Sequence, residues 1–542
     1  MDSSTVDTTK DTAERPQQEQ RIDHDLLKSK YDELSVGRTL WVFKRVALIS
    51  LAVYTGYVCE GFELGSSGSV IANAGFIKQF GDEGRDADGV RALNPSWVSA
   101  WSAFLNVGQI LTFTYISWFA DRFGRKMSFY VAWLWLAVGC TLLNTAKTPA
   151  VWLIAKLCNG AGVGVLQITC QVYVMEICPD NIRGGMVTFQ LLWNNVGSII
   201  ISAMMQQLNK KHPDEYLPAM RILWAPIGLM LVCWMFVPES PWFYARHGRR
   251  DAALAAMRKL YGGVPGYDFE AEYSIIARTI ELERVHLQEA TRGGPRYVDL
   301  FRGANLRRTM TVMLTSVTSQ FGGLAIVNTY STYFFALAGL EDPFLASLII
   351  SCVGLLATLF WCTTTDIIGR RLMITTFQTF TCVALFLVGG LYWTGASQGN
   401  VAASKGLIAV CCLWSFAFTI VGQAHYLFSA ELPSALLRIK TGPITFLANS
   451  LLGIATTFAT PRMLLALNLR TAFVFGAFSV PIMVLLWLYL PETKGRSAAE
   501  IDELFERKVP AWRWASTVTA VEEDMRAEVR GDKDGVIELE DA

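Results

Sequence analysis

The chain has 542 residues, of which 52% are hydrophobic and only 17% carry a charged side chain. Soluble domains carry about 25% charged residues, so this composition argues against an ordinary soluble protein. The 47 basic and 47 acidic residues cancel, which removes any electrostatic reason to expect a nucleic-acid partner. Most of the eleven cysteines lie in apolar stretches without a C-x-x-C motif, so we expect buried thiols, with no metal site and no resident cofactor.

The hydrophobic residues gather in blocks of about 20 residues, the length that a helix needs to cross a bilayer. This pattern predicts an all-α membrane protein with twelve transmembrane helices in two pseudo-symmetric six-helix halves. The first six spans are expected at 46–72, 97–119, 127–146, 150–178, 184–206 and 219–238. The second six are expected at 309–337, 344–363, 373–394, 404–430, 442–465 and 471–490.

The polar segments between and around these spans divide the chain further. The segment between the halves is charged and shows helical periodicity, as in Asp251–Tyr261 and Glu270–Glu289, which predicts a helical linker domain outside the membrane. The predicted regions are a mobile tail over 1–44, a bundle over 45–238, the linker over 239–308, a second bundle over 309–491 and a tail over 492–542.

Three short charged motifs occur twice in the chain at nearly the same displacement. The acid, glycine and paired bases of Asp121–Lys126 recur 245 residues later at Asp366–Arg371. The other two pairs, 255 and 253 residues apart, are Glu176 with Arg183 and Glu431 with Arg438, and Pro238-Glu239-Ser240 and Pro491-Glu492-Thr493. Three unrelated motifs in one register indicate an internal duplication, in which each half holds six spans.

The charged turns also indicate the orientation of the chain. Lys and Arg are enriched on the cytoplasmic side of membrane proteins. The turns, the linker and the C-terminal tail are basic, whereas the loop at 339–343 contains no Lys or Arg. We therefore expect the basic side to face the cytoplasm, with both termini there because the number of spans is even.

Each charged turn places an acid and fixed bases where helix ends approach the membrane surface, so ion pairs can join neighbouring helices. Such pairs can hold one face of a carrier shut and must break for the opposite state to form. The alternative is that they only determine topology. The gating candidates are Asp121, Arg122, Arg125, Glu176, Arg183 and Glu239 in the first half and Asp366, Arg370, Arg371, Glu431, Arg438 and Glu492 in the second.

Together, these motifs resemble the signatures of the sugar porter family of the major facilitator superfamily. Two further stretches, Tyr330–Phe335 and Ala499–Glu506, are similar to fungal α-glucoside (maltose-type) permeases. The resemblance implies a monomeric plasma-membrane carrier, not an enzyme, that moves a small-molecule sugar across the lipid bilayer by alternating access. The motifs that match are Asp121-Arg122-x-Gly124-Arg125-Lys126, Glu176 with Arg183-Gly184, Pro238-Glu239-Ser240-Pro241 and Pro491-Glu492-Thr493-Lys494-Gly495.

Three charges inside predicted spans stand out, because a charge at mid-membrane costs about 2.5–3.5 kcal/mol on insertion scales. Glu60 and Glu63 are three residues apart and share one face of the first span, and Lys156 begins the fourth. In proton-coupled sugar porters a Gly-Tyr-Asp motif and an Arg stand at the positions of Gly61-Phe62-Glu63 and Lys156. Glu63 is therefore the hypothesised proton acceptor, with Glu60 and Lys156 beside it and the proton gradient as driving force. A structural pair in a facilitative carrier is the alternative.

Polar and aromatic side chains in apolar helices are candidates for substrate contacts, because an unpaired polar group is costly there. Hydrogen bonds between helices are the alternative for each of them. The candidates are Gln190, Asn194, Gln320, Asn328, Tyr330, Gln423, His425, Tyr426 and Asn449.

The match with the family's sugar site is partial. Leu191 and Ala325 stand where the resemblance places a Gln and an Asn, and Ser450 stands at a position that is usually Trp in hexose porters. These departures argue against a glucose-selective pocket and favour a disaccharide, another glycoside or a secondary metabolite. Two further alternatives stay open: an exporter of a metabolite on the same scaffold, and a sugar sensor that does not transport.

Overall fold

The computed structural model describes residues 31, 36–82, 91–291, 297–394, 401–433, 438–494, 496 and 498–520. These residues are almost entirely helical, and the only strand-like pairing among them is one isolated bridge between Asp82 and Ala92. Most of the predicted N-terminal tail and the end of the C-terminal tail lie outside the described residues. The prediction of an all-α fold is confirmed.

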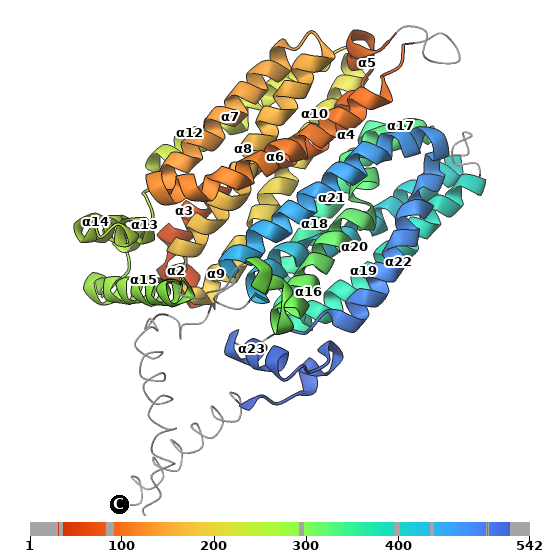
Figure 1. The fold of residues 1–542 in the computed structure, drawn as a ribbon. Helices are drawn as coiled ribbons and strands as arrows, with labels where there is room; N and C mark the ends of the chain where they lie inside the picture. Colours follow the sequence, from red (N-terminus) through yellow and green to blue (C-terminus); the bar gives the residue numbers. More distant parts are fainter. Residues whose placement is uncertain are drawn as a thin grey trace, which may run out of the picture.

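The first bundle is built of long helices that lie side by side, with short helices before and between them (Figure 1). Two long helices begin with proline at a position where its missing N–H costs nothing: Pro95 starts α6 and Pro149 starts α8. The helices are α2 (Val36–Val42), α3 (Lys44–Tyr54), α4 (Tyr57–Ile71), α5 (Ala74–Phe80), α6 (Pro95–Phe123), α7 (Arg125–Thr145), α8 (Pro149–Ile177), α9 (Asp180–Thr188), α10 (Gln190–Lys211), α11 (Leu217–Ile222) and α12 (Trp224–Phe236).

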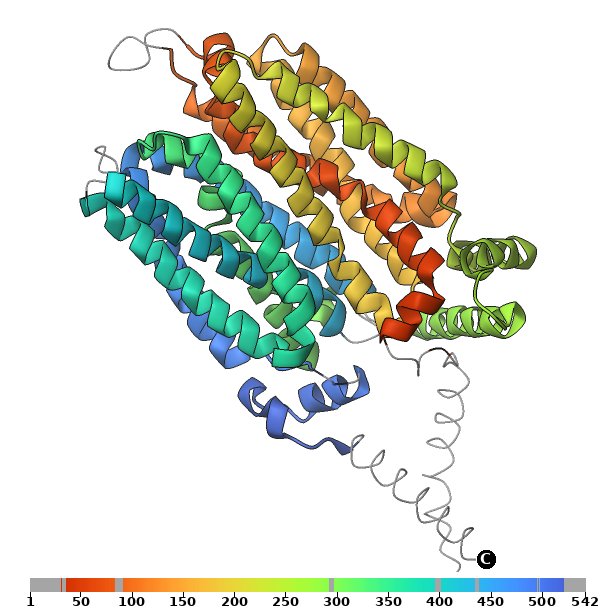
Figure 2. The same cartoon turned by 180° about the vertical axis from the view of Figure 1, so that it is seen from behind.

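The second bundle repeats this plan and lies alongside the first (Figure 2). Its elements are α16 (Gly303–Ser319), η2 (Gln320–Thr329), α17 (Ser331–Leu337), α18 (Pro343–Ile368), α19 (Arg370–Gly390), η3 (Leu391–Thr394), α20 (Val401–Glu431), α21 (Arg438–Leu467), η5 (Asn468–Arg470) and α22 (Thr471–Tyr489).

Several predicted spans contain a break. The segment predicted at 309–337 changes from α16 to the π-helical η2 and is kinked at Gly323, where φ is 96°. That conformation suits glycine, and the indole Nε1 of Trp414 donates to the Gly322 carbonyl oxygen at 2.9 Å beside the kink. The segment predicted at 46–72 is likewise two helices separated by Thr55 and Gly56.

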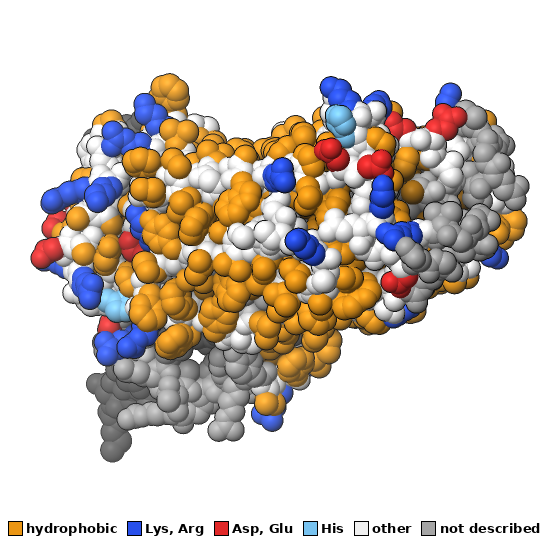
Figure 3. All heavy atoms as spheres, turned by 90° about the horizontal axis from the view of Figure 1, so that it is seen from above, with side chains coloured by type: hydrophobic (Ala, Val, Ile, Leu, Met, Phe, Trp, Pro, Cys, Tyr) orange, Lys and Arg blue, Asp and Glu red, His pale blue; other side chains and the backbone are white. Residues whose placement is uncertain are grey.

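Ten stretches of the described chain are long and apolar enough to cross a membrane. One of them, Ile444–Tyr489, contains α22 and most of α21, and α6 is not among the ten although it packs along α8 and α21. Figure 3 shows a face on which hydrophobic side chains dominate the middle and charged ones gather toward the two ends. The chain is a multi-pass membrane protein, and the count of twelve spans stays a prediction.

The remaining helices lie beyond one end of the bundles, which we call the inner end (Figures 1 and 2). The helices predicted at Asp251–Tyr261 and Glu270–Glu289 correspond to α14 and α15, and the division into five regions remains a prediction. The inner-end elements are α13 (Pro241–Arg246), α14 (Arg250–Tyr261), α15 (Phe269–Thr291) and η1 (Tyr297–Phe301) after the first bundle, and α23 (Ala498–Glu506) and η6 (Ala511–Ser516) after the second.

The two bundles are joined at the opposite, outer end. One cluster of buried hydrophobic side chains runs from the first bundle into the outer part of the second, whereas a separate cluster fills the inner part of the second bundle. Hydrogen bonds also cross between the bundles near the outer end: Ser69 and Thr332 hydroxyls lie 3.1 Å apart, and those of Ser202 and Ser351 lie 3.2 Å apart. This arrangement is closed on its outer side.

Candidate functional site

The charged turn of the first bundle is organised by Arg125, which is only 3% exposed. Its guanidinium donates to Asp121 Oδ1 at 3.1 Å and to Glu176 Oε1 at 2.8 Å, so it joins the ends of α6 and α8. Glu239 approaches from the other side, and its two oxygens accept the backbone N–H groups of Arg125 and Lys126, each at 3.0 Å. Glu239 therefore caps the N-terminus of α7. Burial raises the pKa of its carboxyl, and these backbone donors oppose that rise.

The second bundle repeats this geometry. Glu492 accepts the backbone N–H groups of Arg370 and Arg371 at 3.0 and 3.1 Å, and so caps α19. The Arg370 guanidinium lies 3.6 Å from Glu431, the counterpart of the pair between Arg125 and Glu176. The glycine before each helix has a positive φ, 100° at Gly124 and 107° at Gly369. The duplicated motifs thus build the same capped turn twice.

The other gating candidates are placed less tightly. Arg183 Nη2 donates to the Cys178 carbonyl oxygen at 3.5 Å, and Arg122 is exposed beside the Phe123 ring. The side chains of Asp366 and Arg438 lie outside the described residues. The ion pairs described for this network stay within one bundle, so they join neighbouring helices and not the two halves.

A buried ion pair lies between α4 and α8 in the first bundle. Lys156 Nζ lies 2.6 Å from Glu63 Oε2 and 3.0 Å from the Ser66 hydroxyl. The second carboxylate oxygen, Oε1, accepts from Asn159 Nδ2 at 2.7 Å. Glu63 is fully buried, and Lys156 is 2% exposed. The structure thus brings the predicted partners Glu63 and Lys156 together, with hydrogen bonds to both carboxylate oxygens.

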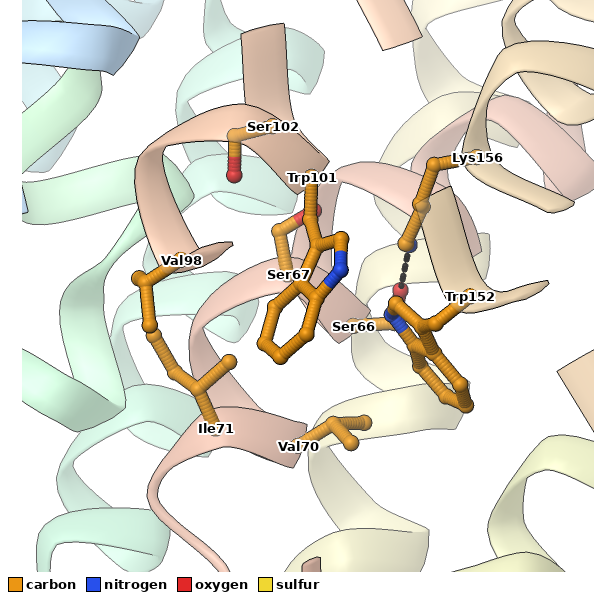
Figure 4. Close-up of a pocket in the computed structure, with 9 residues that line it drawn as sticks. All are labelled: Ser66, Ser67, Val70, Ile71, Val98, Trp101, Ser102, Trp152 and Lys156. Carbon is orange, nitrogen blue, oxygen red and sulfur yellow. Dashed lines mark hydrogen bonds between the residues drawn. The ribbon is translucent and has the colours of Figure 1, made fainter. Parts of the chain in front are cut away.

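A pocket lies on the outer side of this pair, between α4, α6 and α8 (Figure 4). The Trp101 indole lies in its centre, with the hydrogen bond from Lys156 to Ser66 on one side and Val98 and Ile71 on the other. The lining side chains are Ser66, Ser67, Val70, Ile71, Val98, Trp101, Ser102, Trp152 and Lys156. Lys156 therefore contacts both the buried carboxylate and a partly polar pocket.

Glu60 lies one turn before Glu63 in a different environment. Its Oε1 atom accepts from Gln167 Nε2 at 2.7 Å, whereas its buried Oε2 atom has no hydrogen-bond partner among the described residues. An unpaired buried carboxyl oxygen is costly, so Oε2 is a site for a donor that the described side chains do not supply. A substrate hydroxyl or a proton would fill that role.

A complementary group lies in the second bundle. His425 is 1% exposed; its Nδ1 lies 2.7 Å from the Ser316 hydroxyl, and its Nε2 has no partner in the described part of the chain. The rings of His425 and Tyr426 both pack against Phe446, at 5.0 and 5.9 Å between centroids. Phe446 in turn contacts Phe113 of the first bundle at 6.0 Å, so this aromatic cluster lies where the halves meet. Apart from the backbone of α20 and the neighbours of Gly422 in sequence, no described atom lies within 4 Å of the position that a Cβ would take at Gly422, one turn earlier on α20.

Four further substrate candidates are hydrogen-bonded to protein groups or buried by them. Gln320 donates to Asn449 Oδ1 at 3.0 Å and accepts from Thr456, so these two amides satisfy each other between helices. The Tyr330 hydroxyl donates to the Thr457 carbonyl oxygen within the outer closure. Gln190 is 1% exposed, and its Oε1 has no partner among the described residues.

The last three substrate candidates are not shown in contact with a ligand-sized site. Two of them differ in how far their side chains are exposed, and the side chain of the third lies outside the described residues. Asn328 is exposed, whereas Asn194 is half-buried on α10, which packs against Gly61 of α4. The Gln423 side chain lies outside the described residues. Asn159, Gln167 and Ser316 contact the candidate site but were absent from the sequence-based predictions. Their only signal was a polar side chain within an apolar helix.

The chain matches the family model described as "Sugar (and other) transporter" over residues 48–505. Relatives include a general alpha-glucoside permease of Saccharomyces cerevisiae, 27% identical over 90% of this chain and 80% of the relative. The MFS transporter fmqE of Aspergillus fumigatus is 29% identical over 86% of this chain and 88% of its own length. An inward-open structure of the xylose transporter XylE from E. coli superposes with a TM-score of 0.68, at 18% identity over 85% of this chain and 99% of that one.

The XylE likeness shows that the two chains share a fold, and the family match covers the spans, the linker and the duplicated motifs alike. The resemblance drawn from those motifs is therefore confirmed. This chain belongs to the sugar (and other) transporter family.

Proposed function

We propose that this protein is a secondary active transporter that takes up an α-glucoside or a related sugar together with protons by alternating access. The buried pair of Glu63 and Lys156 carries the proposal. Two charges inside an apolar bundle are costly, and replacing such pairs by hydrophobic residues is often neutral or stabilising. A pair of this kind is better explained by a carboxyl that gains and loses a proton during transport than by stability alone.

The position of Glu63 connects its charge to the outer closure. Protonation would remove its attraction to Lys156 and so loosen α4 from α8. Two turns further along α4, the Ser69 hydroxyl contacts Thr332 of the second bundle. A change in the position of α4 would therefore reach the contacts that close the outer side.

The proposed substrate site lies at the meeting of the halves, near Glu60 and His425. Glu60 Oε2 and His425 Nε2 are buried polar atoms without a hydrogen-bond partner among the described residues, and Gln190 Oε1 is a third. Sugar hydroxyls can both donate and accept, so one sugar can satisfy all three kinds of atom. The rings of Tyr426, Phe446 and Phe113 add apolar surface for a pyranose face.

The membrane orientation is part of the proposal. The inner end carries the basic turns and the linker helices, which supports a cytoplasmic position for this end and for both termini. The closed outer side then corresponds to an inward-facing carrier. The ion pairs of the capped turns are formed in this arrangement and lie within one bundle, so their proposed gating role is to hold the inner helix ends in the shape that closure needs in the opposite state. The protein would act as a monomer in the plasma membrane without enzymatic activity.

A metabolite carrier is the second candidate. The cluster of His425, Tyr426, Phe446 and Phe113 offers more aromatic surface than hydroxyl groups alone require, which favours a substrate with a flat aromatic part. The departures at Leu191, Ala325 and Ser450 agree with such a ligand.

The test is uptake of radiolabelled maltose and glucose by cells that lack their own sugar carriers, with the external pH recorded at the same time. We expect maltose to enter with alkalinisation of the medium, and Glu63→Gln to abolish accumulation against a gradient. Sugar entry without a pH change would reduce Glu63 to a structural role. Failure of both sugars to enter would favour the metabolite carrier.

A further inference from the structure

The two oxygens of Glu63 are served by two different side chains of α8. Lys156 donates to Oε2 at 2.6 Å, and Asn159, three residues along the same helix face, donates to Oε1 at 2.7 Å. Lys156 also donates to Ser66, so its ammonium group is shared, whereas the Asn159 amide has Glu63 as its recorded partner. The second donor to the carboxylate is therefore a neutral amide with no other hydrogen bond described.

Asn159 is held in place by α7. A Cβ at Gly139 would lie 1.8 Å from Asn159 Oδ1, so the amide occupies a socket that exists because residue 139 has no side chain. Asn159 is fully buried, and its Oδ1 has no hydrogen-bond partner among the described residues. A buried amide oxygen without a hydrogen-bond partner is costly. The hydrogen bond that the same amide donates to Glu63 offsets this cost and explains the placement. Turning the amide over would set Oδ1 against a carboxylate oxygen.

We infer that Asn159, seated in the Gly139 socket, is a positioning residue that sets how tightly Glu63 holds its proton. This inference rests on the proposed proton-coupled function. The titratable groups around Glu63 are Lys156 of α8, Cys140 of α7, and Cys59 and Glu60 of its own helix. On the α10 side, the neighbouring contact is the neutral hydroxyl of Ser198, which donates to the Gly61 carbonyl oxygen.

The consequence follows from the charge of the carboxylate. A hydrogen bond to the charged form favours that form, so Asn159 promotes release of the proton. Without this donor, the charged form of Glu63 would lose one hydrogen bond, and the protonated form would be favoured. Release into a near-neutral cytoplasm would then become slow, while exchange of substrate by the protonated carrier would continue.

The experiment uses two variants of the full chain in proteoliposomes, with radiolabelled maltose as the probe. Asn159→Leu removes the donor, and Gly139→Ala keeps the amide but fills its socket. We expect both to shift the midpoint of the pH profile of uptake upward by about a unit and to lower the maximal rate, with maltose exchange at equal concentrations retained. Asn144→Leu is the control, because that amide donates to the Cys140 carbonyl oxygen of its own helix.

The outcomes separate this inference from the proposed function. If the wild type moves maltose without protons, the proposed function fails, whatever the variants do. If the wild type is coupled and the profile of either folded variant matches that of Asn144→Leu, the inference is overturned and Asn159 only fills space. If one variant does not reach the membrane, the other decides, since the two disturb the same contact from different helices.

Discussion

Glu239 caps the helix that Arg125 begins: its carboxylate accepts the backbone N–H groups of Arg125 and Lys126 from a segment more than a hundred residues away in sequence. Glu492 does the same for Arg370 and Arg371 in the second bundle. The geometry that the two halves share thus depends on hydrogen bonds from backbone N–H groups to side chains as much as on ion pairs. A cap of this kind fixes the angle between a turn and the helix that follows it.

Removing the caps should lower stability. Glu239→Ala leaves two N–H groups at the start of α7 without an acceptor and should reduce the free energy of unfolding by about 1–2 kcal/mol, and Glu492→Ala should behave alike. Glu239→Gln keeps one acceptor oxygen, so its loss in the free energy of unfolding should lie between that of Glu239→Ala and zero. Thermal unfolding of the purified protein measures this. The control is Glu270→Ala, because the exposed ion pair of Glu270 with Arg250 should contribute little to stability. If Glu239→Ala and Glu270→Ala lost the same stability, the capping role of Glu239 would be contradicted.

Alanine should not be tolerated at the glycine before either capped helix. At Gly124 the positive φ strains any side chain, and a Cβ would lie 2.3 Å from Glu239 Oε2. At Gly369 the corresponding distance to Glu492 Oε2 is 2.7 Å. We expect Gly124→Ala and Gly369→Ala each to cost about 1–2 kcal/mol or more, because strain and loss of the cap add. Gly228→Ala, in a helix with open space around it, is the matched control and should not lower the melting temperature.

The ion pair between Glu63 and Lys156 should show strong coupling in a double-mutant cycle. Lys156→Met alone leaves a buried carboxylate with one neutral donor and should destabilise the protein by about 3–5 kcal/mol. Adding Glu63→Gln removes the unpaired charge and should recover much of that loss. Melting temperatures of the two single variants and the double variant give the coupling energy. Additive losses would mean that the two charges do not stabilise each other.

His425 should affect substrate affinity without affecting proton coupling. His425→Ala removes Nε2, which has no partner in the described part of the chain, and a ring of the aromatic cluster. We therefore expect the KM for the substrate to rise roughly tenfold at an unchanged ratio of protons to substrate. Gln378→Leu provides the control: Gln378 is buried in the same bundle but donates to Ser479 between α19 and α22. Its loss should lower stability and leave the KM unchanged. The opposite pattern would remove His425 from the substrate site.

The sequence predicted the organisation of this protein well where its signal was repeated. The duplicated turns at Asp121–Lys126 and Asp366–Arg371 predicted two matching halves, because the same charges must meet the same neighbours in each. Charge patterns could not distinguish an ion pair from a cap, since Glu239 and Glu492 act on backbone groups that every residue carries.

Local breaks and uncharged partners were harder to predict. The kink at Gly323 lies inside an apolar stretch, and hydropathy contains no information on φ. Asn159 is followed by glycines at 160, 162 and 164, a pattern typical of close helix packing that does not indicate a partner for the amide. Its bond to Glu63 depends on the rotation of α8 relative to α4 and on the space at Gly139, both of which are set by tertiary packing.

The outer closure should have to open for transport, and a cross-link can test this. The hydroxyls of Ser69 and Thr332 lie 3.1 Å apart across the two bundles, so cysteines at both positions are close enough for a disulfide. Oxidation of the double variant Ser69→Cys with Thr332→Cys should abolish uptake, and reduction should restore it. Either single variant should keep its uptake under oxidation, which controls for the protein's own eleven cysteines. Uptake that persists in the fully cross-linked protein would mean that α4 and α17 do not separate during transport.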